Sequence, residues 1–165
     1  MFKAAVISLA LAVTASSTPS FAGPPGLACN PVKRAALKAF AHYYVAVVNQ
    51  RNPSLFGLVF SDDIVLESTA GYFEGLDQYT AVMTGVFVGL PDIDYTVDEV
   101  LVDGDNFVLR YHYTGTHLGE LFGFPPTGDV ITCSGLEINR VANGRIYESL
   151  NFTDLNCLLM GLSGQ

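Results

Sequence analysis

The sequence is poor in basic residues and contains no tryptophan. Its 165 residues include 8 Lys and Arg against 16 Asp and Glu, giving a formal net charge of −8. Such a chain repels nucleic-acid phosphates and anionic membrane surfaces, so we expect neither as a partner. It also has no phosphate-binding loop of the P-loop type and no GxGxxG motif. These absences speak against a nucleotide-dependent enzyme.

Side chains that bind metals or act as nucleophiles are also scarce. The three histidines are His42, His112 and His117, and no Cys-x-x-Cys pair occurs. His112 and His117 are five residues apart in an expected strand, so they point to opposite faces. We therefore expect no metal site. No Ser-His-Asp set stands out, which argues against nucleophilic catalysis.

The first 22 residues are typical of a secretory signal peptide. They contain Lys3, an apolar run over residues 4–15, and Ser-Phe-Ala before an expected cleavage after Ala22. The apolar run is too short to cross a bilayer as a helix. The sequence thus predicts a secreted or periplasmic protein without a membrane span. A lipoprotein anchored through Cys29 is the alternative.

After residues 1–22 we expect a short Pro/Gly leader over residues 23–30 and one domain over residues 31–165. The three cysteines are Cys29, Cys133 and Cys157, so one thiol is left over if a disulfide forms. Because chain termini often lie close together, the favoured pair is Cys29–Cys157. Cys133 falls within an expected strand and is predicted to be a buried thiol.

Helical periodicity dominates the first half of the domain, and a period of two dominates the second half. Helices are predicted over residues 32–50, from Pro53, over residues 76–88 and over residues 154–162. Strands are predicted over residues 64–68, 93–102, 106–117, 130–141 and 146–152. Helices followed by antiparallel strands indicate an α+β fold. We expect a curved antiparallel sheet wrapped around the N-terminal helices, forming a cone with a hydrophobic pocket.

Alternation along the strands gives the candidate pocket residues a direction. Phe107, Leu109, Tyr111, Tyr113 and His117 share one face of residues 106–117, while Arg110, His112, Thr114 and Thr116 share the other. In the last strand, the same rule places Glu148, Leu150, Phe152 and Asp154 on one face, predicted to be the pocket face if no bulge intervenes.

Three motifs carry a resemblance to a known family. They are GYFEG at residues 71–75, GTHLGELFGFPPTG at residues 115–128 and NGRIYE at residues 143–148, followed by a late Asp154. The chain from about residue 32 to 162 resembles the SnoaL-like polyketide cyclases, also called ester cyclases. The resemblance implies the nuclear transport factor 2-like fold, which agrees with the cone inferred from periodicity.

The resemblance also implies a chemistry. The better-known members close a ring by intramolecular aldol condensation, without metal or nucleotide, so we expect no cofactor. By position, Asp154 would be the general acid/base and His117 would donate a hydrogen bond to the substrate oxygen. The structural alternatives are that Asp154 is only the N-cap of the last helix and that His117 forms a hydrogen bond that stabilises the turn. The predicted substrate-binding residues are Tyr43, Tyr111, Tyr113, Phe122, Leu150 and Phe152. Leu150 stands where the family commonly has Trp.

The leading hypothesis is a secreted, cofactor-free enzyme acting on a small apolar carbonyl compound by proton transfer. The alternative is an exported, non-catalytic protein that binds a small hydrophobic ligand, which the absent Trp favours. A third is dehydration or epoxide opening, although the epoxide reaction wants an Asp-Arg-Asp set and Arg110 points outward. The family often pairs through the outer sheet face, so a homodimer through His112, Thr114 and Thr116 is compatible with the sequence.

Overall fold

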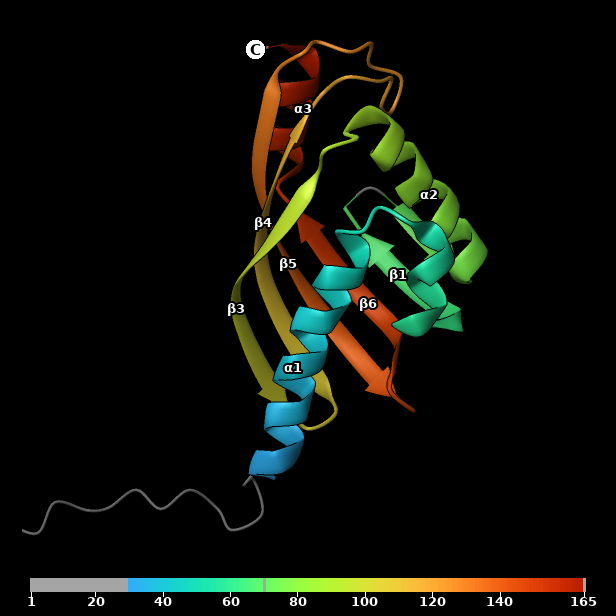
Figure 1. Cartoon of the computed structure of the whole chain (residues 1–165), viewed down its shortest axis with the longest axis vertical. Coiled ribbons are helices and arrows are strands. Elements are labelled where there is room, and N and C mark those ends of the chain that lie inside the picture. The colour runs from blue at the N-terminus through green and yellow to red at the C-terminus, as the bar shows by residue number, and fades with distance from the viewer. Residues whose placement is uncertain (1–29, 70, 165) are drawn as a thin grey trace, which may run out of the picture.

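The computed structural model describes residues 30–69 and 71–164. The expected signal peptide and Cys29 lie outside the described residues, as does nearly all of the leader. The elements are α1 (Pro31–Val48), the 3-10 helix η1 (Pro53–Leu58), β1 (Phe60–Ser68), β2 (Gly71–Glu74), α2 (Leu76–Gly89), β3 (Asp94–Asp103), β4 (Asn106–Thr116), β5 (Val130–Ala142), β6 (Arg145–Thr153) and α3 (Leu155–Ser163). Their arrangement is shown in Figure 1.

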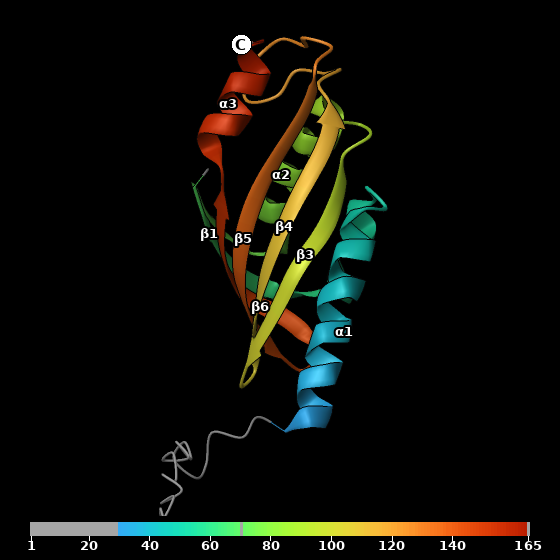
Figure 2. The ribbon, with the colours of Figure 1, turned by 90° about the vertical axis from the view of Figure 1, so that its left-hand side faces the viewer.

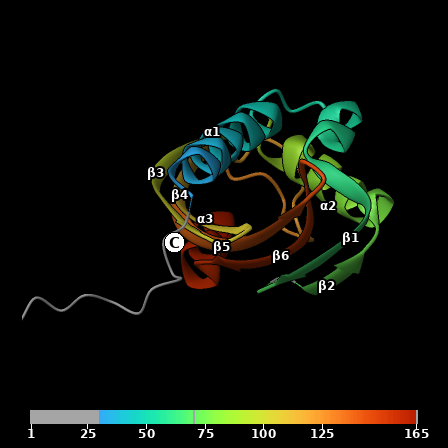
Figure 3. The ribbon, with the colours of Figure 1, turned by 90° about the horizontal axis from the view of Figure 1, so that it is seen from below.

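Six strands form one sheet in the order β2-β1-β6-β5-β4-β3. The sheet curves around α1 and α2 (Figure 3), which confirms the predicted α+β cone. Neighbouring strands are antiparallel except β1 and β6, which are parallel. Neither this parallel pair nor β2 was predicted, since alternation within a strand does not indicate which distant strands will pair.

The first helix begins as its sequence predicts. Asn30 caps it by accepting a hydrogen bond from the backbone N–H of Val32 at 2.9 Å, and Pro31 occupies the first turn. Asn52 and Pro53 repeat the signal, but only the short 3-10 helix η1 follows, because β1 starts at Phe60. In Figure 2, α1 runs alongside β3 at one edge of the sheet.

The alternation predicted for β4 is confirmed. Phe107, Leu109, Tyr111 and Tyr113 are buried on the concave face, while Arg110 is exposed on the other. Burying each large apolar side chain stabilises the fold by about 1.5–3 kcal/mol. β4 therefore fixes both the core and one wall of the interior.

The orientation predicted for β6 is wrong. Ser149, Asn151 and Thr153 line the concave side, whereas Leu150 and Phe152 lie on the opposite face. β6 pairs regularly with β5 from Glu148 to Thr153, with Asn151 opposite the buried Glu137, so the predicted alternation holds but the other face is the inner one. Parity counted from Asp154 alone could not detect which face was buried.

The predicted Cys29–Cys157 disulfide is also corrected. Cys157 on α3 is bonded to Cys133 on β5, with the two Cα atoms 5.8 Å apart. The helix packs against β5, and its Gly161 approaches so closely that an added Cβ would lie 2.8 Å from Ile131 Cγ1. This packing brings Cys157 to Cys133, a residue expected to remain a free thiol.

Candidate functional site

The concave side of the sheet encloses a cavity of about 130 Å³. Apolar side chains of α1, α2, β1, β3 and β4 form most of its wall, and Leu155 and Leu158 of α3 contribute at one end. A dry apolar cavity of about 150 Å³ holds a benzene-sized molecule. The interior therefore suits a compact, mainly apolar ligand.

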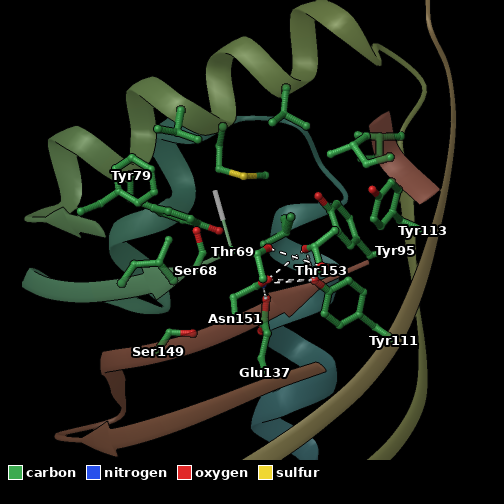
Figure 4. A pocket seen from close by; sticks show the side chains of 18 of the residues that line it. Ser68, Thr69, Tyr79, Tyr95, Tyr111, Tyr113, Glu137, Ser149, Asn151 and Thr153 are labelled. Atoms are coloured by element: carbon green, nitrogen blue, oxygen red, sulfur yellow. Dashed lines mark hydrogen bonds between the residues drawn. The ribbon is translucent and has the colours of Figure 1, made fainter. Parts of the chain in front are cut away.

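Two aromatic groups face this interior (Figure 4). The Phe60 group consists of Tyr44, Phe60 and Tyr79, with Phe60 5.4 Å from Tyr44 and 4.7 Å from Tyr79 between ring centroids. The Tyr95 group consists of Tyr95, Tyr111 and Tyr113, with Tyr95 5.7 Å from Tyr111 and 5.5 Å from Tyr113. Each group supplies phenol hydroxyls as well as ring faces.

The carboxyl group of Glu137, on β5, is buried in this cavity. Asn151 Nδ2 donates to its Oε1 at 2.6 Å, and Asn139 Nδ2 donates to its Oε2 at 3.2 Å. The Tyr44 hydroxyl lies 3.2 Å from Oε1 and 3.1 Å from Oε2. Because Tyr44 has one hydrogen to donate, three hydrogens serve about four acceptor positions. The carboxylate therefore has the capacity to accept one further hydrogen bond.

Asn151 links Glu137 to two further polar side chains, Tyr111 on β4 and Thr153 on β6. Its Nδ2 also donates to the Tyr111 hydroxyl at 3.1 Å, and its Oδ1 accepts from the Thr153 hydroxyl at 3.0 Å. The hydroxyls of Tyr111 and Thr153 are 3.2 Å apart. We call Glu137, Asn151, Tyr111 and Thr153 the polar cluster; its hydrogen bonds are drawn in Figure 4.

Burial raises the pKa of Glu137 above its ordinary value of 4.5, although hydrogen bonds from Asn139, Tyr44 and Asn151 offset part of this shift. Burial, followed by the charge of Glu137, raises the pKa values of Tyr44, Tyr79 and Tyr111. Burial likewise raises the pKa of Tyr113 to about 12. The phenols therefore remain donors near neutral pH, while Glu137 holds a proton more readily than an exposed carboxyl.

Three of the six predicted substrate-binding residues line the cavity: Tyr111, Tyr113 and Phe122. Tyr43 is 47% exposed, and its neighbour Tyr44 takes the position facing the interior. Leu150 and Phe152 lie on the outer face of β6. A binding role for any of the six stays a prediction.

The structure does not bring Asp154 and His117 together in the cavity. Asp154 is exposed and caps α3, its Oδ1 accepting from the backbone N–H of Cys157 at 3.0 Å. His117 is fully buried outside the cavity wall, with Nδ1 3.2 Å from the Thr127 hydroxyl. Among the described residues, no hydrogen-bond partner is found for its Nε2.

The loop over residues 117–129, between β4 and β5, lies at the edge of the cavity, to which it contributes Leu121 and Phe122. The backbone N–H groups of Leu118 and Gly119 donate to Gly89 O at 2.9 and 3.1 Å, joining the loop to the end of α2. A Cβ on Gly119 would lie 2.3 Å from Val88 O. Only glycine allows this close approach.

Sequence reasoning missed Glu137, Asn151 and Tyr44. Glu137 shares the buried face of β5 with Ile131, Cys133 and Asn139, while Leu136 and Ile138 occupy the other face. Both faces of the strand are therefore partly apolar, and alternation does not identify the inner one. One feature of the sequence could have identified Glu137. It and Asn139 are polar side chains two residues apart, on one face of a strand that pairs with the aromatic strand β4.

Within residues 30–69 and 71–164, no three His, Cys, Asp or Glu side chains gather closely enough to hold a metal ion. In the same ranges, no helix has the length and hydropathy needed to cross a membrane. The expectation of a cofactor-free protein remains a prediction.

The chain belongs to the SnoaL-like polyketide cyclase family, whose profile matches residues 38–160. The fold is that of nuclear transport factor 2-like and ketosteroid isomerase-like proteins, as the resemblance implied. A comparison with curated proteins gives no significant match.

Solved structures of similar fold include three bacterial proteins. AclR from Streptomyces galilaeus is 28% identical, with a TM-score of 0.72 and coverage of 80% of this chain and 83% of AclR. IdmH from Streptomyces antibioticus is 25% identical, with a TM-score of 0.66 and coverage of 76% and 97%. A SnoaL-like polyketide cyclase from Agrobacterium tumefaciens is 17% identical, with a TM-score of 0.64 and coverage of 76% and 97%.

Proposed function

We propose that this chain is a cofactor-free enzyme that moves protons on a small apolar carbonyl compound, in an aldol-type cyclisation or a related reaction. The supporting observation is the burial of Glu137 in an apolar cavity that holds no other acidic or basic side chain among the described residues. Family membership supports cyclase or isomerase chemistry. The geometry favours Glu137 as the acid/base group.

The proposed reaction needs no second reagent. The Glu137 carboxylate takes a proton from the carbon next to the substrate carbonyl, and the C–H electron pair becomes an enolate. The hydroxyl of Tyr111, which accepts a hydrogen bond from Asn151 Nδ2, donates its own hydrogen to the enolate oxygen. The enolate carbon forms a bond to a second carbonyl carbon of the same molecule, and the resulting alkoxide takes the proton back from Glu137.

The environment of Glu137 suits both halves of this cycle. Its pKa is raised by burial, so the proton it accepts is held more firmly than by an exposed carboxylate. Asn139, Asn151 and Tyr44 still stabilise the charged form, so the group can return to being a base. A carboxyl group tuned between these states is suited to proton shuttling.

The absent Trp does not argue against catalysis in this arrangement. The corresponding residue, Leu150, lies on the outer face of the sheet, so a larger side chain there would not reach the cavity. The non-catalytic carrier therefore has less support than the sequence suggested, although binding without turnover is the outcome that would establish it.

Exchange of α-protons tests the proposal without knowledge of the natural substrate. We would incubate 2-indanone, a compact apolar ketone, with protein in D₂O and follow deuterium incorporation by NMR. The wild type should accelerate exchange, and Glu137→Gln should lower the enzymatic rate about 100-fold or more, as for loss of a general base. The matched control is Glu148→Gln, a half-exposed residue paired with Arg140 at 3.4 Å on the outer side.

Wild-type exchange at the rate of buffer alone, despite binding of the ketone, would establish the carrier alternative. Equal exchange by wild type and Glu137→Gln would contradict the assignment of Glu137. Melting temperatures of all three proteins should be measured alongside, so that loss of folding is not read as loss of chemistry.

We also propose that residues 1–22 direct export. Their charged start and short apolar run support this proposal. Mass spectrometry of the mature protein from a bacterial periplasm should show an N-terminus at Gly23. A full-length chain recovered from the cytosol would contradict it.

A further inference from the structure

The cavity carries a negative charge when Glu137 is ionised. Within the described residues, Glu137 is the one carboxyl side chain that lines the wall, and no Lys, Arg or His lines it. None of the ion pairs found in that part of the chain involves Glu137. Its carboxyl group is neutralised only by protonation or by a ligand.

Aromatic rings lie on both sides of this carboxyl group. Figure 4 shows Tyr79 of the Phe60 group on one side and the Tyr95 group on the other, with Glu137 and Asn151 between them. The face of an aromatic ring is electron-rich and attracts a cation within about 6 Å of the ring centre. Several aromatic rings around one site are a known means of binding quaternary ammonium groups.

We propose that this cavity binds a small organic cation, a quaternary ammonium or a substituted amine carried on an apolar body. The cationic head lies between the two aromatic groups and opposite Glu137. Its methyl groups contact the ring faces, and the rest of the ligand contacts the aliphatic wall formed by α2.

Alternative ligand classes fit less well. An anion would face Glu137 without a basic partner, and a metal ion would find one carboxyl group where several ligands are needed. A neutral hydrocarbon would leave the carboxyl group unused. A quaternary ammonium donates no hydrogen bond, so it leaves the bonds from Tyr44, Asn139 and Asn151 to Glu137 in place. The chain's net charge of −8 also favours the approach of cations.

Binding should depend on the protonation of Glu137. Burial raises its pKa above 4.5, so the group gains its full charge only at higher pH. The titratable groups that influence it are phenols, which stay neutral in the same range because burial raises their pKa values: Tyr44 from α1, Tyr79 from α2, Tyr95 from β3 and Tyr111 from β4. Affinity for a cation should therefore rise as Glu137 ionises.

The inference concerns the same cavity as the proposed function but does not rest on proton transfer. It follows from the charge of Glu137 and the surrounding rings, and it holds for an enzyme or a carrier alike. If both are right, the natural substrate is a carbonyl compound that also carries an ammonium group.

The test compares choline with 3,3-dimethylbutan-1-ol, in which carbon replaces the charged nitrogen and the shape is kept. Isothermal titration calorimetry of the full chain at pH 8 should show choline binding at least about tenfold more tightly. In Glu137→Gln this ratio should fall to about threefold or less. Glu148→Gln, outside the cavity, should keep the wild-type ratio.

The inference is overturned if wild type binds the neutral alcohol as tightly as choline, or if choline does not bind at millimolar concentration. It is also overturned if Glu137→Gln, shown to be folded by circular dichroism, keeps the full preference. Ketone exchange separates the two proposals. A preference for choline without ketone exchange would support this inference and contradict the proposed enzyme. Ketone exchange without a preference for choline would support the proposed enzyme and contradict this inference.

Discussion

Glu137 is a buried carboxyl group with no basic partner among the described residues, and burying such a group lowers the stability of a fold. It is 7% exposed and is held by neutral donors. Removing one donor would leave a buried carboxylate oxygen without a partner, which should lower the free energy of unfolding by about 1–3 kcal/mol. If the residue had only a structural role, an apolar side chain at this position would give a more stable fold. We therefore interpret the presence of Glu137 in the cavity as functional.

Stability should depend on pH through Glu137, with the opposite sign from a salt-bridged carboxylate. Its pKa is higher in the folded protein than the ordinary 4.5 expected when unfolded, so folding favours the protonated form. The associated stabilisation is present below pH 4.5 and is lost as pH rises through the folded-state pKa. Urea unfolding should show wild type losing stability relative to Glu137→Gln as pH rises from 4.5. A difference independent of pH would contradict this.

Gly135 is required by the position of Tyr111. A Cβ there would lie 2.3 Å from Tyr111 Cζ, so Gly135→Ala must displace the phenol and break its contacts with Asn151 and Thr153. We expect a loss of about 1–3 kcal/mol in the free energy of unfolding. Gly85→Ala is the control, because nothing lies within 4 Å of its added Cβ in α2 and alanine favours helix. Stability of Gly135→Ala equal to wild type would be evidence against this packing.

At the scale of elements, α3 completes one end of the cavity and is held there by several contacts. Its N-terminus is capped by Asp154, its Leu155 and Leu158 line the interior, and Cys157 joins it to β5. The cap alone explains Asp154 as a structural residue. Any catalytic role for it would have to be performed from the exposed end of the helix.

The disulfide assignment predicts a specific redox response. Cys133 and Cys157 are 24 residues apart, and closing a loop of that length stabilises a protein by about 3 kcal/mol. Reductant should lower the free energy of unfolding by that amount in wild type and in Cys29→Ser, but not in Cys133→Ala/Cys157→Ala. Peptide mapping that recovered Cys29 bonded to Cys157 would contradict the assignment.

The elements also show what sequence could predict. The β4 face was predictable because aromatic residues alternate with Arg110, His112 and Thr114, so only one face is apolar. β5 has apolar residues on both faces, and β6 carries Leu150 and Phe152 outside with polar residues inside. The same rule therefore predicted the wrong face for Leu150 and Phe152. Long-range facts, namely the β1–β6 pairing and the proximity of Cys157 to Cys133, depend on packing between distant segments.

At the scale of the whole molecule, an apolar row crosses the outer face of the sheet. Leu101, Val108, Ile138 and Leu150 are register partners on β3, β4, β5 and β6, and Leu101 is 56% exposed. The nearby His112 and Thr114 pair with Asp98 and Thr132 on the same face. An exposed row of this kind suits contact with a second copy of the chain.

We therefore predict a homodimer in solution. Light scattering should give twice the mass of one chain, and Ile138→Lys should give a folded monomer by placing a charge in the row. Gln50→Lys, exposed beyond the end of α1, should remain dimeric. A monomeric wild type at tens of micromolar would contradict the prediction.

The whole molecule is a cone in which family membership defines the scaffold and the side chains inside it define the chemistry. In this chain, Glu137 and several tyrosine side chains line the interior. Asp154 and His117, the residues expected from the motifs, lie outside the cavity wall. The central claim is that proton transfer belongs to Glu137.

The most direct test is the rate of α-proton exchange in Glu137→Gln and Asp154→Asn, measured side by side on the same ketone. Asparagine caps a helix about as well as aspartate, so Asp154→Asn should keep α3 in place. We predict a loss of about 100-fold or more in Glu137→Gln and a rate within about threefold of wild type in Asp154→Asn. Loss in Asp154→Asn with a near-normal rate in Glu137→Gln would contradict the account.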